Sequence, residues 1–119
     1  MKKPVILVVD DEENVRLLFK EELEDEGFSV DLAENGYEAI EKVKGNDYDL
    51  VVLDIKMPGI DGIRTLSEIK AIRKNLPVIL CSAYSEYKQD LTSWISEDYV
   101  VKSADTSELK QKIKNILGL

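Results

Sequence analysis

The chain has 119 residues, of which 44% are apolar, 16 are Lys or Arg, 24 are Asp or Glu and none is histidine. This length can bury one sizeable core, whereas the formal charge of -8 disfavours direct binding to nucleic acid or anionic lipid, which would be repelled. The absence of histidine excludes imidazole catalysis and most zinc or haem sites, and a lone cysteine, Cys81, excludes an internal disulfide. Any chemistry must therefore depend on carboxylates, hydroxyls and lysine.

The amino terminus contains no segment that predicts export or membrane insertion. Its apolar run, Val5–Val9, is shorter than a signal peptide or a membrane span requires. No repeat, low-complexity tract or linker divides the chain. We therefore expect a single domain over residues 1–119, with a cytoplasmic location.

Short apolar runs separated by longer segments predict strands that alternate with helices. Four runs are continuously apolar, as is typical of parallel strands covered on both faces: residues 5–9, 50–53, 78–81 and 99–101. Residues 28–33 alternate polar and apolar side chains instead, which favours a strand at the edge of the sheet.

Five segments show the spacing of amphipathic helices. Their apolar positions are Val15, Leu18, Phe19 and Leu23; Ala39, Ile40 and Val43; Ile63, Leu66, Ile69 and Ile72; Tyr87, Leu91, Trp94 and Ile95 within residues 86–95; and Leu109, Ile113, Ile116 and Leu117. Gly27 and Gly45 are the expected stops of the first two helices, and Asp105 is the expected cap of the last, in a capping box with Glu108.

The acidic residues within 21–26 are expected to form a solvated face without a partner. Five such βα units indicate an α/β domain with a doubly wound parallel sheet and helices on both faces.

Chemically capable side chains follow four of the predicted strands. They are Asp10 and Asp11 after the first, Asp54 after the third, Ser82 after the fourth and Lys102 after the fifth. The carboxyl ends of parallel strands meet at one edge of the sheet, where such folds bind ligands. Three carboxylates without His or Cys favour a hard cation, Mg²⁺ or Mn²⁺, while Lys102 and Ser82 offer donors to phosphoryl oxygens. Asp54 ends the most central run and is the expected nucleophile of a phosphoryl transfer.

The motifs VVDDE, LVVLDIKMPGIDG, VILCSAYSE and DYVVK occur in the order and spacing of response-regulator receiver domains. The sequence resembles this family over the whole chain. The resemblance implies a flavodoxin-like (βα)5 fold with the strand order 2-1-3-4-5. It also implies that Asp54 is the phosphoacceptor. The residues implied to bind Mg²⁺ are Asp11, as a direct ligand, Asp54, and Lys56 through its backbone carbonyl, while Asp10 acts through water.

The same resemblance assigns roles to residues around the acceptor. Ser82 matches the switch hydroxyl that turns toward the phosphoryl group, Tyr99 matches the aromatic switch, and Lys102 matches the lysine of the family motif. Lys56 and Tyr84 occupy positions that tune how fast water removes the phosphate. Only the resemblance assigns a switch role to Tyr99, because an aromatic residue in a strand is also explained by simple packing.

One position departs from the family pattern. The motif lysine, Lys102, is usually followed by proline, commonly after a cis bond, and here the next residue is Ser103. A cis bond before serine costs about 3 kcal/mol. We therefore expect either a trans bond or a locally strained loop.

The first predicted helix carries candidate residues for docking a partner. Asn14, Val15 and Leu18 lie near its start, close to the acidic pair, whereas Leu17 lies off the main apolar arc. Ordinary packing explains this pattern equally well. The alternative is a docking patch for a sensor histidine kinase or a histidine phosphotransfer protein, as in related receivers.

The leading interpretation is a response regulator of a two-component or phosphorelay system. It would accept a phosphoryl group from a phosphohistidine, change conformation and signal to a downstream protein, with no catalysis beyond its own phosphorylation and dephosphorylation. A Mg²⁺-dependent aspartyl-phosphate phosphohydrolase is an alternative, but it predicts a second Asp where Lys56 stands and a cap domain for which no residues remain. A flavodoxin-like cofactor binder is a further alternative, but the sequence lacks the phosphate-binding loop that such a protein needs after the first strand. A receiver fragment of a larger DNA-binding regulator stays open, although the end of the last helix near Leu119 favours a complete protein.

Overall fold

The computed structural model describes residues 3–82, 98–103 and 105–119. Its elements are β1 (Val5–Val9), α1 (Glu13–Asp25), β2 (Ser29–Ala33), α2 (Gly36–Gly45), β3 (Leu50–Asp54), α3 (Gly62–Ile72), β4 (Val78–Ser82), β5 (Asp98–Val101) and α5 (Ser107–Leu117). The strands form one parallel sheet in the order β2-β1-β3-β4-β5. The α/β fold and its strand order are thus as predicted, while the helix predicted over 86–95 lies outside the described residues.

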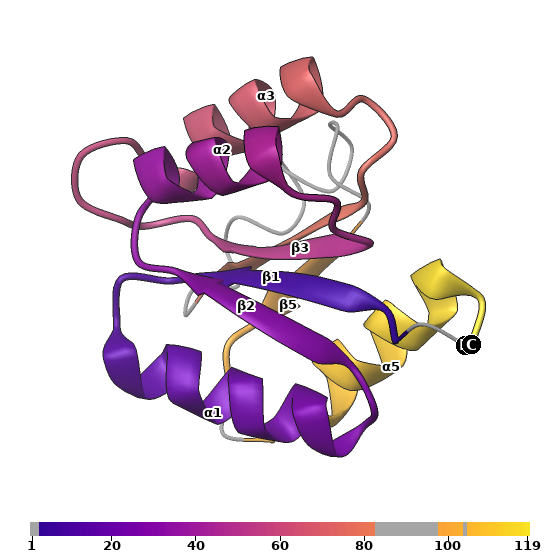
Figure 1. The fold of residues 1–119 in the computed structure, drawn as a ribbon. Helices are drawn as coiled ribbons and strands as arrows, with labels where there is room; N and C mark the ends of the chain where they lie inside the picture. Colours follow the sequence, from indigo (N-terminus) through magenta and orange to yellow (C-terminus); the bar gives the residue numbers. More distant parts are fainter. Residues whose placement is uncertain (1–2, 83–97, 104) are drawn as a thin grey trace.

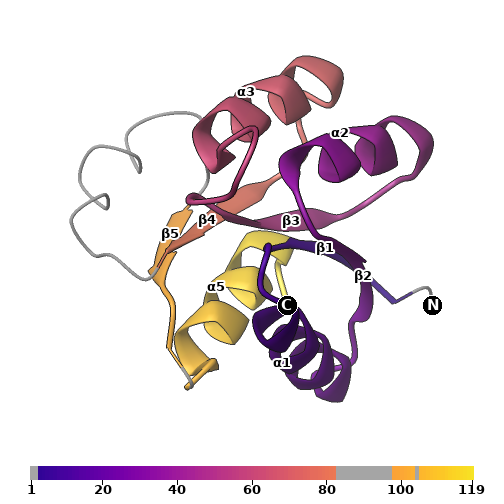
Figure 2. The ribbon, with the colours of Figure 1, turned by 90° about the vertical axis from the view of Figure 1, so that its left-hand side faces the viewer.

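Helices cover both faces of the sheet and bury two apolar layers. Figures 1 and 2 show α2 and α3 on one face and α1 and α5 on the other. Alternate residues of the central strands supply the two layers, because successive side chains of a strand point to opposite faces. Leu53 packs in the layer of α2 and α3 with Leu66, and Val52 packs in the layer of α1 and α5 with Phe19. All five residues of β3 and of β4 are buried, which explains why the first four residues of each strand are apolar.

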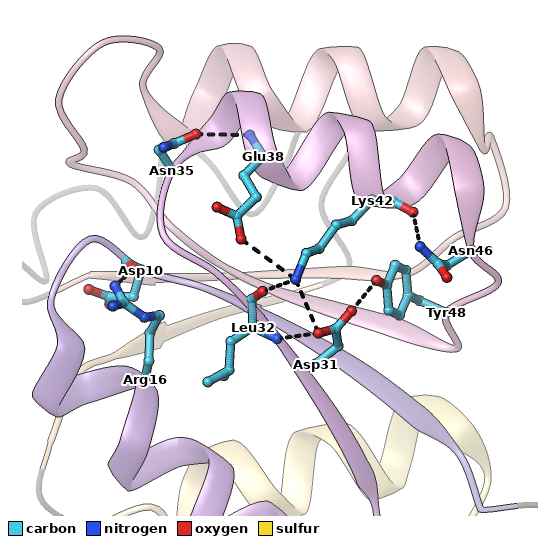
Figure 3. A network of polar contacts seen from close by, with 9 residues as sticks. All are labelled: Asp10, Arg16, Asp31, Leu32, Asn35, Glu38, Lys42, Asn46 and Tyr48. Atoms are coloured by element: carbon cyan, nitrogen blue, oxygen red, sulfur yellow. Dashed lines mark hydrogen bonds and ion pairs between the residues drawn. The ribbon is translucent and has the colours of Figure 1, made fainter.

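The open edge of β2 is covered by side chains rather than by another strand (Figure 3). Leu32 directs both of its backbone polar groups away from β1. Its N–H donates to Oδ1 of Asp31 (2.9 Å), and its carbonyl oxygen accepts from Nζ of Lys42 (2.5 Å). Lys42 also lies 3.2 Å from Oδ1 of Asp31, whose Oδ2 accepts from the hydroxyl of Tyr48 (2.6 Å). The predicted edge strand is therefore confirmed, and α2 and the approach to β3 supply its cover.

This network shifts two titrations in opposite directions. Burial opposes the ionisation of Asp31, but the hydrogen bonds from Tyr48 and Lys42 outweigh it and hold the pKa of Asp31 below its ordinary value. Burial, followed by the hydrogen bond to the Asp31 carboxylate, raises the pKa of Tyr48. The Tyr48 phenol therefore stays protonated, and a hydrogen-bond donor, to a higher pH than an ordinary tyrosine.

The acidic end of α1 pairs with α5, contrary to the expectation of a solvated face without a partner. Nζ of Lys110 lies 3.0 Å from Oε2 of Glu22, and Nζ of Lys114 lies 3.2 Å from Oε1 of Glu26. The expectation was wrong because the lysines stand 88 positions further along the chain than their partners, a distance over which sequence spacing gives no information.

The start of α5 differs slightly from the predicted capping box. Oδ1 of Asp105 accepts the backbone N–H of Ser107 (2.9 Å), and the backbone N–H of Asp105 donates to Oγ of Ser103 (3.1 Å). The N-cap of α5 is Thr106, whose side chain makes no capping hydrogen bond. The cap predicted at Asp105 was therefore wrong: Asp105 stands one residue earlier, and its carboxylate binds the N–H of the first helical residue, Ser107, rather than that of Glu108. Within the described residues, no helix has both the length and the apolar character needed to cross a bilayer.

Candidate functional site

The predicted site residues come together at the carboxyl edge of the sheet because the strands are parallel and in register. Val9 lies beside Leu53, so Asp10 and Asp54, the residues that follow them, extend from adjacent strands. The backbone N–H of Lys102 donates to the carbonyl oxygen of Ser82 (2.6 Å), which places β5 beside the end of β4. Asp10, Asp54 and Ser82 are all buried, with 2%, 4% and 1% of their surface exposed.

Lys102 joins the two buried carboxylates. Its Nζ lies 2.7 Å from Oδ2 of Asp10 and 3.2 Å from Oδ1 of Asp54. Two carboxylates held this close would repel each other in a poorly solvated place, and the ammonium between them offsets that repulsion. The arrangement is therefore a compact polar site in which one ammonium faces two carboxylates.

The electrostatics of Asp54 distinguish it from an ordinary surface carboxylate. Burial, followed by the negative charge of Asp10, raises the pKa of Asp54 to about 6, although Lys102 acts in the opposite direction. Burial on its own would lower the pKa of Lys102, but the hydrogen bond to Asp10 and the charge of Asp54 together raise it. A further positive charge beside Asp54 would therefore stabilise the ionised form of this carboxylate.

An acidic cluster lies next to this pair. Carboxylate oxygens of Asp10, Asp11 and Glu12 lie within 4.8 Å of one another, and Oδ1 of Asp10 accepts the backbone N–H of Glu12 (2.9 Å). Asp11 and Glu12 are exposed. Sequence reasoning singled out both aspartates but not Glu12, although the motif VVDDE contains it. Asp54 is connected to this cluster through Lys102. An oxygen-only donor set beside an exposed rim fits a hard cation such as Mg²⁺, which retains several waters.

Arg16 is a residue of the site that sequence reasoning missed. It extends from α1 toward the end of β1, and its Nη1 donates to the backbone carbonyl oxygen of Asp10 (2.7 Å; Figure 3). This bond ties α1 to the turn that carries the acidic cluster. No spacing rule connects an arginine on a helix to a carbonyl six positions earlier, so this contact could not be predicted from the sequence.

The segment after Asp54 turns back onto the end of β3. Gly59 adopts a φ of 83°, a conformation that favours glycine, and Asp61 caps α3 by accepting the N–H of Arg64 (2.9 Å). The N–H of Gly62 then donates to the carbonyl oxygen of Ile55 (2.7 Å). Lys56, which lies within this segment, is exposed.

The remaining predicted residues are placed as follows. Tyr99 is fully buried in the layer of α2 and α3, and Tyr84 lies outside the described residues. The bond between Lys102 and Ser103 is trans, as are all other peptide bonds of the described residues. The first of the two expected geometries is therefore observed.

A groove lies between α1 and the residues that follow β5. It has a volume of about 340 Å³ and is lined by Val15, Leu18, Phe19, Lys102 and Ser103. Two of the three predicted docking residues therefore share a surface with Lys102. Asn14, the third, is exposed and is not part of the lining. Leu17 is 52% exposed on the outer side of α1.

Comparison with known proteins identifies the family. Residues 6–114 match the family described as the response regulator receiver domain. The chain is 36% identical over 121 residues to sporulation initiation phosphotransferase F of Bacillus subtilis, with 100% of this chain and 98% of that protein covered. It is 40% identical over 114 residues to the transcriptional regulatory protein ResD of B. subtilis, with 94% of this chain covered but only 47% of ResD.

Solved structures agree with this result. The response regulator protein TrrA of Thermotoga maritima, in complex with Mg(2+)-BeF, is 52% identical with a TM-score of 0.90, and the match covers 95% of this chain and 98% of TrrA. TrrA in complex with the histidine kinase ThkA matches with a TM-score of 0.89 and the same 52% identity, over 96% of this chain and 98% of that one. From its motifs, its fold and these matches, the chain belongs to the response regulator receiver domain family.

Proposed function

We propose that this chain is a signalling phosphoacceptor of a two-component or phosphorelay system. It receives a phosphoryl group on Asp54 from the phosphohistidine of a sensor histidine kinase or a histidine phosphotransfer protein. The observation that carries this proposal is the placement of Nζ of Lys102 between two buried carboxylates, 2.7 Å from Asp10 and 3.2 Å from Asp54. A buried carboxylate beside a fixed ammonium can accept a phosphoryl group whose oxygens that ammonium then binds.

The proposed reaction needs positioning and neutralisation of charge rather than a general base. An oxygen of Asp54 forms a bond to phosphorus while the bond between phosphorus and the donor imidazole nitrogen breaks. The bonding electron pair stays on that nitrogen, which then takes a proton from solvent. Because this chain contains no histidine, the donor imidazole lies outside these 119 residues.

A divalent cation fits beside this acceptor. Asp10, Asp11, Asp54 and the backbone carbonyl of Lys56 are the residues that would hold Mg²⁺, or Mn²⁺ in its place. The cation would neutralise charge on the phosphoryl oxygens. The complex of TrrA with Mg(2+)-BeF supports this assignment, as does the oxygen-only acidic cluster that contains Asp10, Asp11 and Glu12.

Ser82 and Tyr99 are the proposed switch. Ser82 ends β4 beside β5, so its hydroxyl belongs to the edge that carries Asp54 and Lys102. Phosphorylation would favour one of two arrangements of these residues and so change the surface offered to a downstream protein. Lys56 and Tyr84 are proposed to set how long the phosphate persists. The chain acts only on itself in this scheme, and no direct contact with nucleic acid or membrane is part of it.

The groove beside α1 is the proposed docking surface for the phosphodonor. Val15 and Leu18 line it next to Lys102, and Asn14 is exposed nearby. The complex of TrrA with the kinase ThkA supports a histidine kinase as partner.

We assign the protein to the cytoplasm as a single domain over residues 1–119. A receiver within a longer transcriptional regulator is the second candidate, because the chain spans about half of ResD, and the mass of the native protein in cell extract distinguishes the two.

The proposal is tested with acetyl phosphate and Mg²⁺ in the absence of any kinase. One phosphoryl group should be added per chain, and hydroxylamine should release it, as expected of an acyl phosphate. Asp54→Asn should abolish the addition, while Asp47→Asn, on an exposed side chain that precedes the amino end of β3, should leave it unchanged. Labelling that persists in Asp54→Asn contradicts the assignment of the acceptor.

A further inference from the structure

The first residue of α2 leaves no room for a side chain. A methyl group on Gly36 would overlap Oγ1 of Thr65 and would lie 2.6 Å from Cγ2 of Ile60 and 3.2 Å from its carbonyl oxygen. Gly36 does not adopt a positive φ; within the described residues Gly27, Gly59 and Gly118 do. The need for glycine is therefore one of space. Figures 1 and 2 both show α2 and α3 side by side, which agrees with this contact.

The atoms that Gly36 meets belong to the segment that connects Asp54 to α3 and to the first turn of α3. Ile60 lies near the end of that segment and is 4% exposed. Thr65, on the first turn of α3, is fully buried, and both its N–H (3.0 Å) and its hydroxyl (2.8 Å) donate to the carbonyl oxygen of Asp61. Oγ1 of Thr65 thus both binds Asp61 and faces Gly36.

A second close contact continues this connection to the acceptor. A methyl group on Gly62 would overlap the carbonyl oxygen of Asp54 and would lie 2.6 Å from Cα of Ile55. The N–H of Gly62 donates to the carbonyl oxygen of Ile55 (2.7 Å). The start of α3 therefore rests directly on the backbone of Asp54, with no space that a small shift could use.

From these contacts we propose that Gly36 is a positioning residue for the acceptor site. It is the first residue of α2, and it sets how closely α2 approaches Ile60 and Thr65. Through them it sets the placement of residues 55–61 relative to the end of β3. This segment includes the carbonyl of Lys56, so the inference rests on the proposed function of the site and predicts which remote residue controls its geometry.

The test is Gly36→Ala in the full chain, measured by Mg²⁺ titration calorimetry and by the rate of labelling with acetyl phosphate. The added methyl should displace the segment after Asp54, and misplacement of groups around a metal costs about 10-fold in affinity. We expect Mg²⁺ binding to weaken about 10-fold and labelling at a fixed, subsaturating Mg²⁺ concentration to slow in proportion.

Two controls in α2 separate positioning from a general loss of stability. Gly45→Ala introduces the same methyl at the other end of the helix, where nothing lies within 4 Å, and should leave Mg²⁺ binding unchanged. Val43→Ala removes a fully buried side chain and should lower the free energy of unfolding without weakening Mg²⁺ binding. Unchanged Mg²⁺ affinity in folded Gly36→Ala overturns the inference, as does an equal loss of affinity in Val43→Ala.

If Gly36→Ala does not fold, Thr65→Val tests the same connection. Valine keeps the shape that faces Gly36 but removes the hydroxyl bond to Asp61, so Mg²⁺ binding should again weaken, and unchanged affinity contradicts the inference. Failure of the wild-type chain to accept a phosphoryl group, with Mg²⁺ binding intact, is a different result. It contradicts the proposed function and leaves the Mg²⁺ comparison between variants valid.

Discussion

Oδ1 of Asp54 lies 3.2 Å from Nζ of Lys102, and the Asp54 side chain is 5% exposed. The pKa of Asp54 is nevertheless raised to about 6, first by burial and then by Asp10. The folded state therefore binds a proton at Asp54 more tightly than the unfolded state, whose ordinary value is 3.8. Ionisation of Asp54 consequently lowers stability as the pH rises from about 4 to above about 6.

Asp54→Asn should therefore stabilise the protein when Mg²⁺ is absent. The gain should reach about 3 kcal/mol at pH 7.5 and should shrink toward zero as the pH falls to 4. Urea unfolding of both proteins at several pH values measures it. Added Mg²⁺ should reduce the advantage, because the wild-type site gains a cation. A gain that is the same at pH 4 and pH 7.5 contradicts this account.

Lys102→Met should have the opposite effect at neutral pH. It leaves Asp10 and Asp54 facing each other without the ammonium, and breaking a buried charge pair costs about 3 to 5 kcal/mol. The matched control is Lys112→Met, which removes a more exposed pair with Asp98 at 2.8 Å and should cost less than about 1 kcal/mol. Equal losses for the two variants in urea unfolding would show that Lys102 is not required to neutralise the site.

Lys42→Met should weaken the open edge of β2. The carbonyl oxygen of Leu32 loses its donor, which should cost about 1 to 2 kcal/mol, and the Leu32 amide should exchange its hydrogen faster because Asp31 is released. The control is Lys44→Met, because Lys44 is two residues further along α2 and pairs at the surface with Glu41. Since the pKa of Asp31 is lowered in the fold, the network's stabilisation is present above pH 3.8 and is lost as the pH falls through the lowered value. Unchanged exchange at Leu32 in Lys42→Met contradicts the proposed role of the network.

Leu18→Ala should separate kinase docking from the chemistry of the acceptor. Leu18 lines the groove next to Lys102, so transfer from a partner kinase should slow about 10-fold, the effect of losing one good apolar contact at an interface. Labelling by acetyl phosphate should stay the same. Leu17→Ala removes an exposed leucine outside the groove and should change neither rate. Loss of both activities in Leu18→Ala would instead indicate damage to the fold.

Sequence reasoning succeeded where structure depends on local pattern. The continuous apolar runs predicted β3 and β4 within one residue, because both faces of these strands are buried. Once a parallel sheet was predicted, Asp10, Asp54, Ser82 and Lys102 had to share one edge.

Contacts between distant segments were not predictable in the same way. The bond from Arg16 to the Asp10 carbonyl depends on the exact angle between α1 and β1. The space denied to a side chain at Gly36 depends on how α2 packs against α3. Neither contact corresponds to a periodic pattern in the sequence, so both can be identified only in the packed structure.

The ion pairs between α1 and α5 have a consequence for synthesis of the chain. Glu22 and Glu26 are made early, but their partners Lys110 and Lys114 are made 88 residues later. The helical layer on that face of the sheet can therefore close only after α5 has left the ribosome. Until then Leu23 and Phe19 lack the cover of Leu109 and Ile113, with which they form one buried cluster. Incomplete chains should expose this apolar surface and depend on chaperones.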